Sequence, residues 1–277
     1  MSNGGYKGAS PARETSPEQY PGVWELTEQF QAQADGNWPF QAADCAPKSL
    51  RFNGTNAYLS KTPAAAGNRK TWTWSAWVKR SNLGTEQVLW TAGANTNSGV
   101  WSALRFITTD QLQFINNTSN STDINLLTTQ VFRDVSAWFH ILLRADISNA
   151  TANDRIDIYI NGTKVDAYST ETQPGTSVNT GINGAQIHNI GREAARSNYY
   201  CDVYLANVHF IDGQALSCDE FGFFDGAGIW QPKRFTGDYS SGPVYSNFSN
   251  ANGVVASGSL SNLFDSSTST YVQLSQS

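Results

Sequence analysis

Apolar and polar residues alternate in short runs along most of this chain, and turn-forming residues separate the runs. Between residues 71 and 79, Trp72, Trp74, Ala76 and Val78 fall on one side of an extended chain. This period of two is that of a β-strand, whose successive side chains point to opposite faces. Similar runs predict strands at residues 49–52, 71–79, 87–92, 101–106, 111–115, 138–145, 155–160, 164–168, 185–191 and 201–211. Short strands with turns between them are typical of an all-β sandwich.

The pattern also predicts how some of these strands lie. Residues 155–160 place three isoleucines inward and Asp157 and Tyr159 outward. Residues 138–145 are apolar on both faces, which is typical of a strand in the middle of a sandwich. Asn-Gly pairs at 53–54 and 161–162 are hairpin signals, and residues 164–168 would return after the second pair.

The N-terminal region has a different pattern. Residues 1–21 are rich in Gly, Ser, Pro and scattered charge, and we expect a flexible arm. From Val23 to Asp35 the apolar residues recur at helical spacing and form one narrow stripe, so residues 22–44 are predicted to hold a short helix and a Trp-Pro turn. Residues 45–235 would form the sandwich. Residues 236–277, rich in Ser, Gly and Asn, are expected to begin another β module of a larger protein.

Composition narrows the function classes. Charged residues are 15% of the chain and the formal net charge is -5, which argues against a nucleic-acid partner. No apolar run of 18 residues exists, so no membrane-spanning segment is predicted, and the N-terminus lacks the apolar core of a secretory signal. The three cysteines, at 45, 201 and 218, are irregularly spaced, which favours folding in a reducing compartment.

Four motifs, in the right order, resemble laminin-G-like, concanavalin-A-like sandwich domains. They are L-R-F-N-G-T-N-A-Y-L at 50–59, T-W-T-W-S-A-W-V at 71–78, I-D-I-Y-I-N-G at 156–162, and N-V-H-F-I-D followed by A-L-S-C-D-E-F at 207–221. The resemblance covers roughly residues 45–220. It implies a jelly-roll-type antiparallel β-sandwich with a binding or structural role, rather than an enzyme fold built around a nucleophile.

A second resemblance concerns segments on either side of the sandwich. G-V-W-E-L at 22–26, with W-P at 38–39, is similar to a motif of tail and virion-associated proteins of tailed bacteriophages. The segment 221–232 looks like the one that follows such modules in marine phage proteins. The resemblance implies location in a virion and other virion proteins as partners, with anchoring residues Val23, Trp24, Leu26, Phe30 and Trp38. Alternatively, the helix and Trp-Pro turn pack on their own sandwich.

The residues give no support for catalysis. A retaining glycosidase on such a strand needs two carboxylates about 5–5.5 Å apart, which Glu-x-Asp on one strand face would supply. No two acidic residues are spaced by two, and Asp154 and Asp157 are expected on opposite faces. His140, in an apolar strand, is expected to be a hydrogen-bonded sheet histidine, and no Ser lies in a G-x-S-x-G motif. We therefore expect no catalytic residues and no enzyme.

Ligand contacts are predicted from aromatic residues and loop oxygens. Aromatic rings stack on sugars and are favoured at protein interfaces. The candidates for carbohydrate binding are Trp77, Trp101, Tyr159, Tyr199 and Tyr200. Loop 146–154 is rich in oxygen atoms, with Asp146 and Asp154 as calcium candidates, but it lacks a spaced acidic ladder and a solvated loop is favoured. No other cofactor is expected.

Three functional hypotheses follow. The first is a non-enzymatic structural protein of a phage virion, a tail, fibre or capsid-decorating component that displays a lectin-like sandwich and aids host attachment. The second is a dedicated adhesin that binds host surface polysaccharide. The third, a glycan hydrolase on the same fold, lacks its paired carboxylates. Symmetric multimers are common in virions, so a homo-oligomer is expected.

Overall fold

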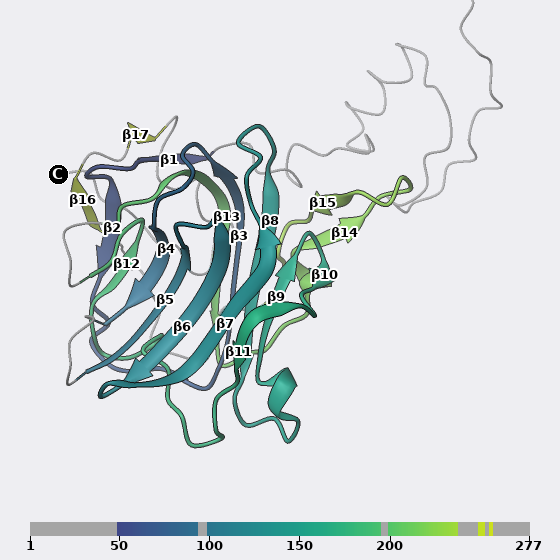
Figure 1. The fold of residues 1–277 in the computed structure, drawn as a ribbon. Helices are drawn as coiled ribbons and strands as arrows, with labels where there is room; N and C mark the ends of the chain where they lie inside the picture. Colours follow the sequence, from purple (N-terminus) through teal and green to yellow (C-terminus); the bar gives the residue numbers. More distant parts are fainter. Residues whose placement is uncertain (1–48, 94–98, 195–198, 238–248, 253–254, 257–277) are drawn as a thin grey trace, which may run out of the picture.

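The computed structural model describes residues 49–93, 99–194 and 199–237, together with the backbone of 249–252 and 255–256. Two large antiparallel sheets pack face to face and form a β-sandwich (Figure 1). This confirms the predicted fold class.

Sheet A has the strand order β10-β9-β8-β3-β13-β1-β17. Its strands are β1 (Leu50–Asn53), β3 (Thr71–Arg80), β8 (Phe139–Asp146), β9 (Ile156–Ile160), β10 (Thr163–Lys164), β13 (Asp202–Asp212) and β17 (Val255–Ala256). Sheet B has the order β11-β7-β6-β5-β4-β12-β2-β16. Its strands are β2 (Tyr58–Lys61), β4 (Gln87–Ala92), β5 (Val100–Phe106), β6 (Gln111–Thr118), β7 (Ser121–Val131), β11 (Tyr168–Thr172), β12 (His188–Ile190) and β16 (Ser249–Asn252).

An aromatic cluster fills the space between the two sheets. Trp72 and Trp74 project inward from β3, as the alternation predicts, and both contact Trp90 of β4, whose ring is edge-on to Trp72 and stacked on Trp74. Phe114 of β6 adds a further edge contact with Trp72. Aromatic side chains bury large areas, and such ring pairs add about 0.5–1.5 kcal/mol beyond that burial. The central core therefore depends on contacts between strands far apart in sequence.

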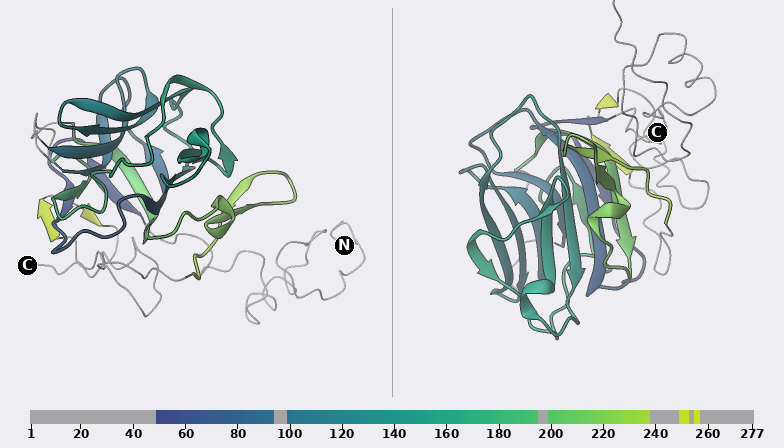
Figure 2. Two further views of the ribbon diagram at one scale, coloured as in Figure 1. Left: turned by 90° about the horizontal axis from the view of Figure 1, so that it is seen from below. Right: turned by 90° about the vertical axis from the view of Figure 1, so that its right-hand side faces the viewer.

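Part of the outer face of sheet A is buried as well, because residues 214–235 cross it (Figure 2). This segment contains a short 3-10 helix at Cys218–Glu220 and a hairpin of two short strands, β14 (Gly222–Phe224) and β15 (Trp230–Pro232). Trp230 stacks on His140 of β8, whose Nε2 lies 2.7 Å from Ser75 Oγ. The prediction that His140 is a hydrogen-bonded sheet histidine is thus confirmed. β8 is apolar on both faces because one face lies in the core between the sheets and the other is covered by residues 214–235.

Most strand predictions are confirmed, and the misses have physical causes. The longest miss is β7, in which consecutive Leu126 and Leu127 break the alternation, although only Leu126 points into the core. The prediction of a hairpin at Asn53-Gly54 is wrong, because β1 and β2 belong to different sheets. Asn53 Oδ1 instead accepts hydrogen bonds from the backbone N–H groups of the next residues as the chain crosses between the sheets.

The second Asn-Gly pair does form a hairpin. Asn161 and Gly162 both have positive φ, and β10 returns beside β9. The predicted return strand 164–168 is wrong beyond Lys164, since the chain then crosses to sheet B and forms β11 against β7. Asp157 faces outward as predicted, yet it is fully buried, because Arg144 and Lys164 both pair with it.

The C-terminal segment contributes edge strands to the sandwich. β16 pairs with β2 and β17 pairs with β1, so parts of the segment expected to begin another module extend both sheets. Residues 238–248, 253–254 and 257–277 lie outside the described residues, and a further module stays a prediction. The predicted arm at 1–21 and helix at 22–44 also lie outside them.

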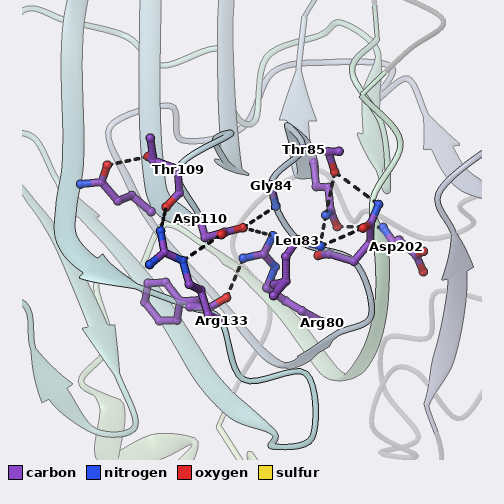
Figure 3. A network of polar contacts seen from close by, with 12 residues as sticks. Arg80, Leu83, Gly84, Thr85, Thr109, Asp110, Arg133 and Asp202 are labelled. Carbon is purple, nitrogen blue, oxygen red and sulfur yellow. Dashed lines mark hydrogen bonds and ion pairs between the residues drawn. The ribbon is translucent and has the colours of Figure 1, made fainter.

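A buried ion pair ties three loops together beside the core (Figure 3). The guanidinium group of Arg80 is fully buried, stacks on Phe106 and lies 3.0 Å from Asp110. Asp110 also accepts a hydrogen bond from Gly84 N at 2.8 Å and pairs with Arg133 at 3.1 Å. Burial raises the pKa of Asp110, but these partners outweigh it and hold the pKa below its usual range. The β3–β4 loop, the β5–β6 turn and the chain after β7 are thereby fixed to one carboxylate.

Candidate functional site

The five aromatic residues predicted to bind carbohydrate lie in three separate places. Trp77 and Tyr159 are on the outer face of sheet A, partly buried against residues 214–235. Trp101 is on the outer face of sheet B, in contact with Ala103 and Ile115, and is only 5% exposed. The rings of these three residues contribute to packing. Their predicted contact with a ligand stays a prediction.

Tyr199 and Tyr200 occupy a more open position, on the segment that leads into β13. Tyr200 lies beside Tyr58 of β2, with ring centroids 6.1 Å apart. The guanidinium carbon of Arg192 is 3.7 Å from the centroid of the Tyr58 ring and 6.0 Å from that of Tyr200, and Arg192 Nη1 donates to the Tyr200 hydroxyl at 3.4 Å. All three side chains are half-buried. We call Tyr58, Arg192 and Tyr200 the tyrosine–arginine cluster.

Strand register brings the cluster together. β12 pairs with β2 so that Ile190 lies opposite Leu59, which places Arg192 close to Tyr58. Gly191 has a φ of 95°, and a Cβ there would lie 2.5 Å from Phe52, so the chain can turn here only because this residue is glycine. On the other side, Val88 N donates to Tyr199 O and Cys201 N donates to Gly191 O, which fixes Tyr200 between them.

The backbone at Tyr199 is strained. Its φ is 60°, in the left-handed region that bulky side chains rarely adopt. Such a conformation costs roughly 1–3 kcal/mol and persists where surrounding contacts enforce it, often at binding sites. The strain at Tyr199 therefore marks the cluster as a place where the fold holds side chains in a set arrangement.

Arg192 is electrostatically unusual among the arginines that the structure describes. Arg51, Arg80, Arg105, Arg133 and Arg144 each pair with a carboxylate. Arg69 and Arg155 donate to backbone carbonyls. Within the described residues, the contacts of Arg192 are the two tyrosine rings and one hydroxyl, and its Nε is buried without an acceptor. A half-buried guanidinium group is thus held in place by aromatic rings, with no carboxylate of the described residues paired to it.

Sequence reasoning missed a second aromatic surface. Trp138 is 38% exposed and lies edge-on to Tyr204 at 6.4 Å. The guanidinium group of Arg51 lies 4.9 Å from the Tyr204 ring and pairs with Asp202. The alternation placed Trp138 inside a strand, whereas β8 begins one residue later, at Phe139. The pattern of the preceding loop contains no signal that would have predicted its exposure.

The acidic residues are engaged in structural contacts. Asp154 and Asp157, expected on opposite faces, both contact Lys164 Nζ, at 2.8 and 2.7 Å, so that prediction is wrong. One ammonium group compensates both carboxylates. Of the calcium candidates, Asp154 has this lysine partner and Asp146 accepts a long hydrogen bond from Asn149. Among the described residues no three His, Cys, Asp or Glu side chains group as metal ligands would.

All three histidines are buried. Burial lowers the pKa of His140 to about 3, with a further contribution from His209, and lowers the pKa of His188 and His209 to about 4. They are neutral near pH 7, and His188 Nε2 accepts a hydrogen bond from Asn183 N. These histidines serve the packing of the two sheets and of residues 214–235.

The proposed anchoring residues Val23, Trp24, Leu26, Phe30 and Trp38 lie outside the described residues. In the part of the chain that the structure covers, no helix has the length and apolar character needed to cross a membrane.

Comparisons with known proteins give one family. A model described as the concanavalin A-like lectin/glucanases superfamily matches residues 53–220. A comparison with curated proteins found no match. Similar solved structures include a heptameric SAP-like pentraxin from Limulus polyphemus, with 15% identity and a TM-score of 0.46 over 76% of this chain and 94% of that one.

Two others are a carbohydrate-binding module and a laminin. The CBM40 of the Ruminococcus gnavus IT-sialidase, bound to α2,3-sialyllactose, has 16% identity and a TM-score of 0.44 over 62% of this chain and 92% of that one. Domains LG4-5 of the mouse laminin α1 chain have 12% identity and a TM-score of 0.42 over 62% of this chain and 43% of that one. These similarities concern the fold.

Proposed function

Because the chain belongs to the concanavalin A-like lectin/glucanases superfamily, we propose that it is a non-catalytic glycan-binding protein that binds through the tyrosine–arginine cluster. The observation that carries the proposal is the arrangement of Arg192 between the half-buried rings of Tyr58 and Tyr200. These residues combine aromatic surface with hydrogen-bond donors in one place, which is the chemistry that sugar rings and their hydroxyl groups require.

The arrangement reduces the entropic cost of binding. Each tyrosine has few rotatable bonds, and the stacked guanidinium group is fixed before a ligand arrives. The backbone at Gly191 and Tyr199 holds both sides of the cluster in place. A ligand would therefore meet side chains that are already positioned, and individual contacts of moderate strength would suffice when several copies bind together.

The test is binding of labelled protein to intact bacterial cells before and after their surface polysaccharide is removed, with a glycan array in parallel. Binding that is lost on removal of the polysaccharide, and that is reduced in a Tyr58→Leu/Tyr200→Leu variant, supports the proposal. Trp138→Ala is the matched control, because it removes an exposed aromatic ring from another face. If Trp138→Ala lost binding and the double tyrosine variant did not, the binding site would lie at Trp138 and not at the cluster.

The absence of catalysis is part of the proposal. Two carboxylates come together beside β9: Asp154, just before the strand, and Asp157, within it, share Lys164, and Asp157 is also paired with Arg144. Neither is available as the unpaired acid that glycoside hydrolysis needs. Turnover of any glycan that the protein binds, measured as release of reducing ends, would contradict this part.

A second candidate is that the protein is a structural component of a phage virion and displays the sandwich for host attachment. The observation that favours a protein partner is the β14–β15 hairpin, which projects from the sandwich with Phe224 52% and Ile229 59% exposed (Figure 1). Asp225 accepts hydrogen bonds from Ala227 N and Ile229 N and so fixes the tip. Exposed apolar residues on a rigid element are typical of interaction sites.

This candidate is tested by incorporation into particles. Removal of residues 1–40, or Phe224→Ser together with Ile229→Ser, should lower the amount of protein in purified particles while glycan binding by the isolated protein is unchanged. Normal incorporation of both variants would count against a virion role for these segments.

A further inference from the structure

The unpaired guanidinium group of Arg192 indicates which glycans the cluster would select. We infer that the tyrosine–arginine cluster binds a saccharide that carries a carboxylate, such as a uronic acid, and that Arg192 holds this carboxylate. The inference rests on the proposed function and deepens it. It begins from the contrast between Arg192 and the seven arginines that already have carboxylate or carbonyl acceptors.

The positive charge of Arg192 is only partly compensated within the cluster. A guanidinium group that loses water on one side needs an acceptor or a counterion in compensation. The tyrosine faces offer partial compensation through cation–π attraction, with Arg192 only 3.7 Å from the Tyr58 centroid. Within the described residues no carboxylate lies within ion-pair distance of Arg192. In the part of the chain that the structure describes, the site thus has a positive group in place that no carboxylate pairs with.

The free hydrogen-bond donors of Arg192 have a fixed geometry. Nη1 donates one hydrogen bond to the Tyr200 hydroxyl, Nε is buried without an acceptor, and Nη2 has no acceptor among the residues that the structure describes. Nη1 and Nη2 form the terminal edge of the planar guanidinium group, and each carries two N–H donors. A carboxylate can accept two parallel hydrogen bonds from such an edge, and a neutral hydroxyl group cannot.

An acidic protein can select a carboxylate-bearing ligand only through a local positive group. The chain has a formal net charge of -5, so its overall field does not attract anionic ligands. Selection for a carboxylate must then come from a local group at the site. Of the three residues in the cluster, Arg192 alone can distinguish a carboxylate from the neutral sugar of the same shape.

The experiment compares uronic-acid polysaccharides, polygalacturonate and hyaluronan, with the same polysaccharides after carboxyl reduction, which removes the charge and keeps the sugar ring. Charge-assisted hydrogen bonds predict that the wild-type protein binds the acidic form about 10- to 100-fold more tightly. Arg192→Gln should abolish this preference. Arg192→Lys, which keeps the charge without the planar edge, should retain part of it. Raised salt should weaken binding of the acidic form alone.

The control is Lys233→Gln, which removes one positive charge from the exposed end of the β14–β15 hairpin region and should leave the preference unchanged. Equal binding of acidic and reduced forms by the wild-type protein would overturn the inference and leave the proposed function standing. A preference that persists in Arg192→Gln would overturn the assignment to Arg192. Failure to bind any glycan of a wide array would overturn both proposals.

Discussion

The guanidinium carbon of Arg192 lies over the ring of Tyr58, 3.7 Å from its centroid. The two residues come from β2 and from the turn after β12, strands that are neighbours in sheet B but far apart in sequence. The contact therefore depends on the completed fold, and its strength can be measured in the protein without any ligand.

A double-mutant cycle on this pair should give a favourable coupling. Tyr58→Leu and Arg192→Met, singly and together, should show an interaction free energy of about 0.5–1 kcal/mol in urea denaturation, as expected for a cation–π contact near the surface. The control is a second cycle on Tyr58→Leu and Arg133→Met. These two residues do not contact each other, so their effects on the free energy of unfolding should be additive. Additivity in both cycles would show that the Tyr58 ring does not hold Arg192.

The buried Arg80–Asp110 pair should be costly to break from one side. Asp110→Asn leaves the Arg80 guanidinium group buried without its charge partner, and we expect a loss of about 3–5 kcal/mol in the free energy of unfolding. Arg133→Gln removes the exposed partner of the same carboxylate and should cost less than about 1 kcal/mol. Similar losses in both variants, measured by urea denaturation, would contradict the separate roles of these arginines.

Acid should destabilise the protein through its buried histidines. Their folded pKa values of about 3 to 4 lie below the ordinary value of 6.5, so the unfolded chain binds more protons as the pH falls below 6.5. Each histidine then contributes a loss of about 1.4 kcal/mol per pH unit, from about pH 6.5 down to its folded pKa. Urea denaturation at pH 7, 6 and 5 should show this slope.

The contribution of one histidine can be isolated. His140→Gln keeps a hydrogen-bonding group near Ser75 and removes one titrating ring, so the pH slope should fall by about one histidine's share. His188→Gln should have the same effect on the slope, since that histidine is equally buried. An unchanged slope in both variants would contradict neutral, buried histidines as its cause.

The hairpin turn at Gly162 should be sensitive to a single methyl group. A Cβ at this position would lie 2.3 Å from the Trp230 ring, and the φ of 77° is itself unfavourable for alanine. Gly162→Ala should therefore displace Trp230 from His140 and change the tryptophan fluorescence. Gly84→Ala is the matched control, because its φ is 69° but no atom lies within 4 Å of the added Cβ. Equal fluorescence changes would rule out the clash with Trp230 as the cause.

The sequence predicted the sandwich and most of its strands because alternation is a local property, visible in Trp72, Trp74, Ala76 and Val78. It could not predict that both faces of sheet A are covered, since that depends on residues 214–235 folding back over His140 and Trp77. The tyrosines at 199 and 200 were recognised by residue type. Tyr58 and Arg192, the partners of Tyr200, were missed, because only the pairing of β2 with β12 brings them near.

The central claim is that the tyrosine–arginine cluster is where a glycan binds. The most direct test is calorimetric titration with a single glycan that the wild-type protein binds. The glycan is titrated into the wild-type protein and into the variants Tyr200→Leu, Arg192→Gln and Trp138→Ala. We predict that the first two variants bind at least about tenfold more weakly, a loss of about 1.4 kcal/mol, and that Trp138→Ala binds as the wild type does. Unchanged affinity in Tyr200→Leu and Arg192→Gln would contradict the claim.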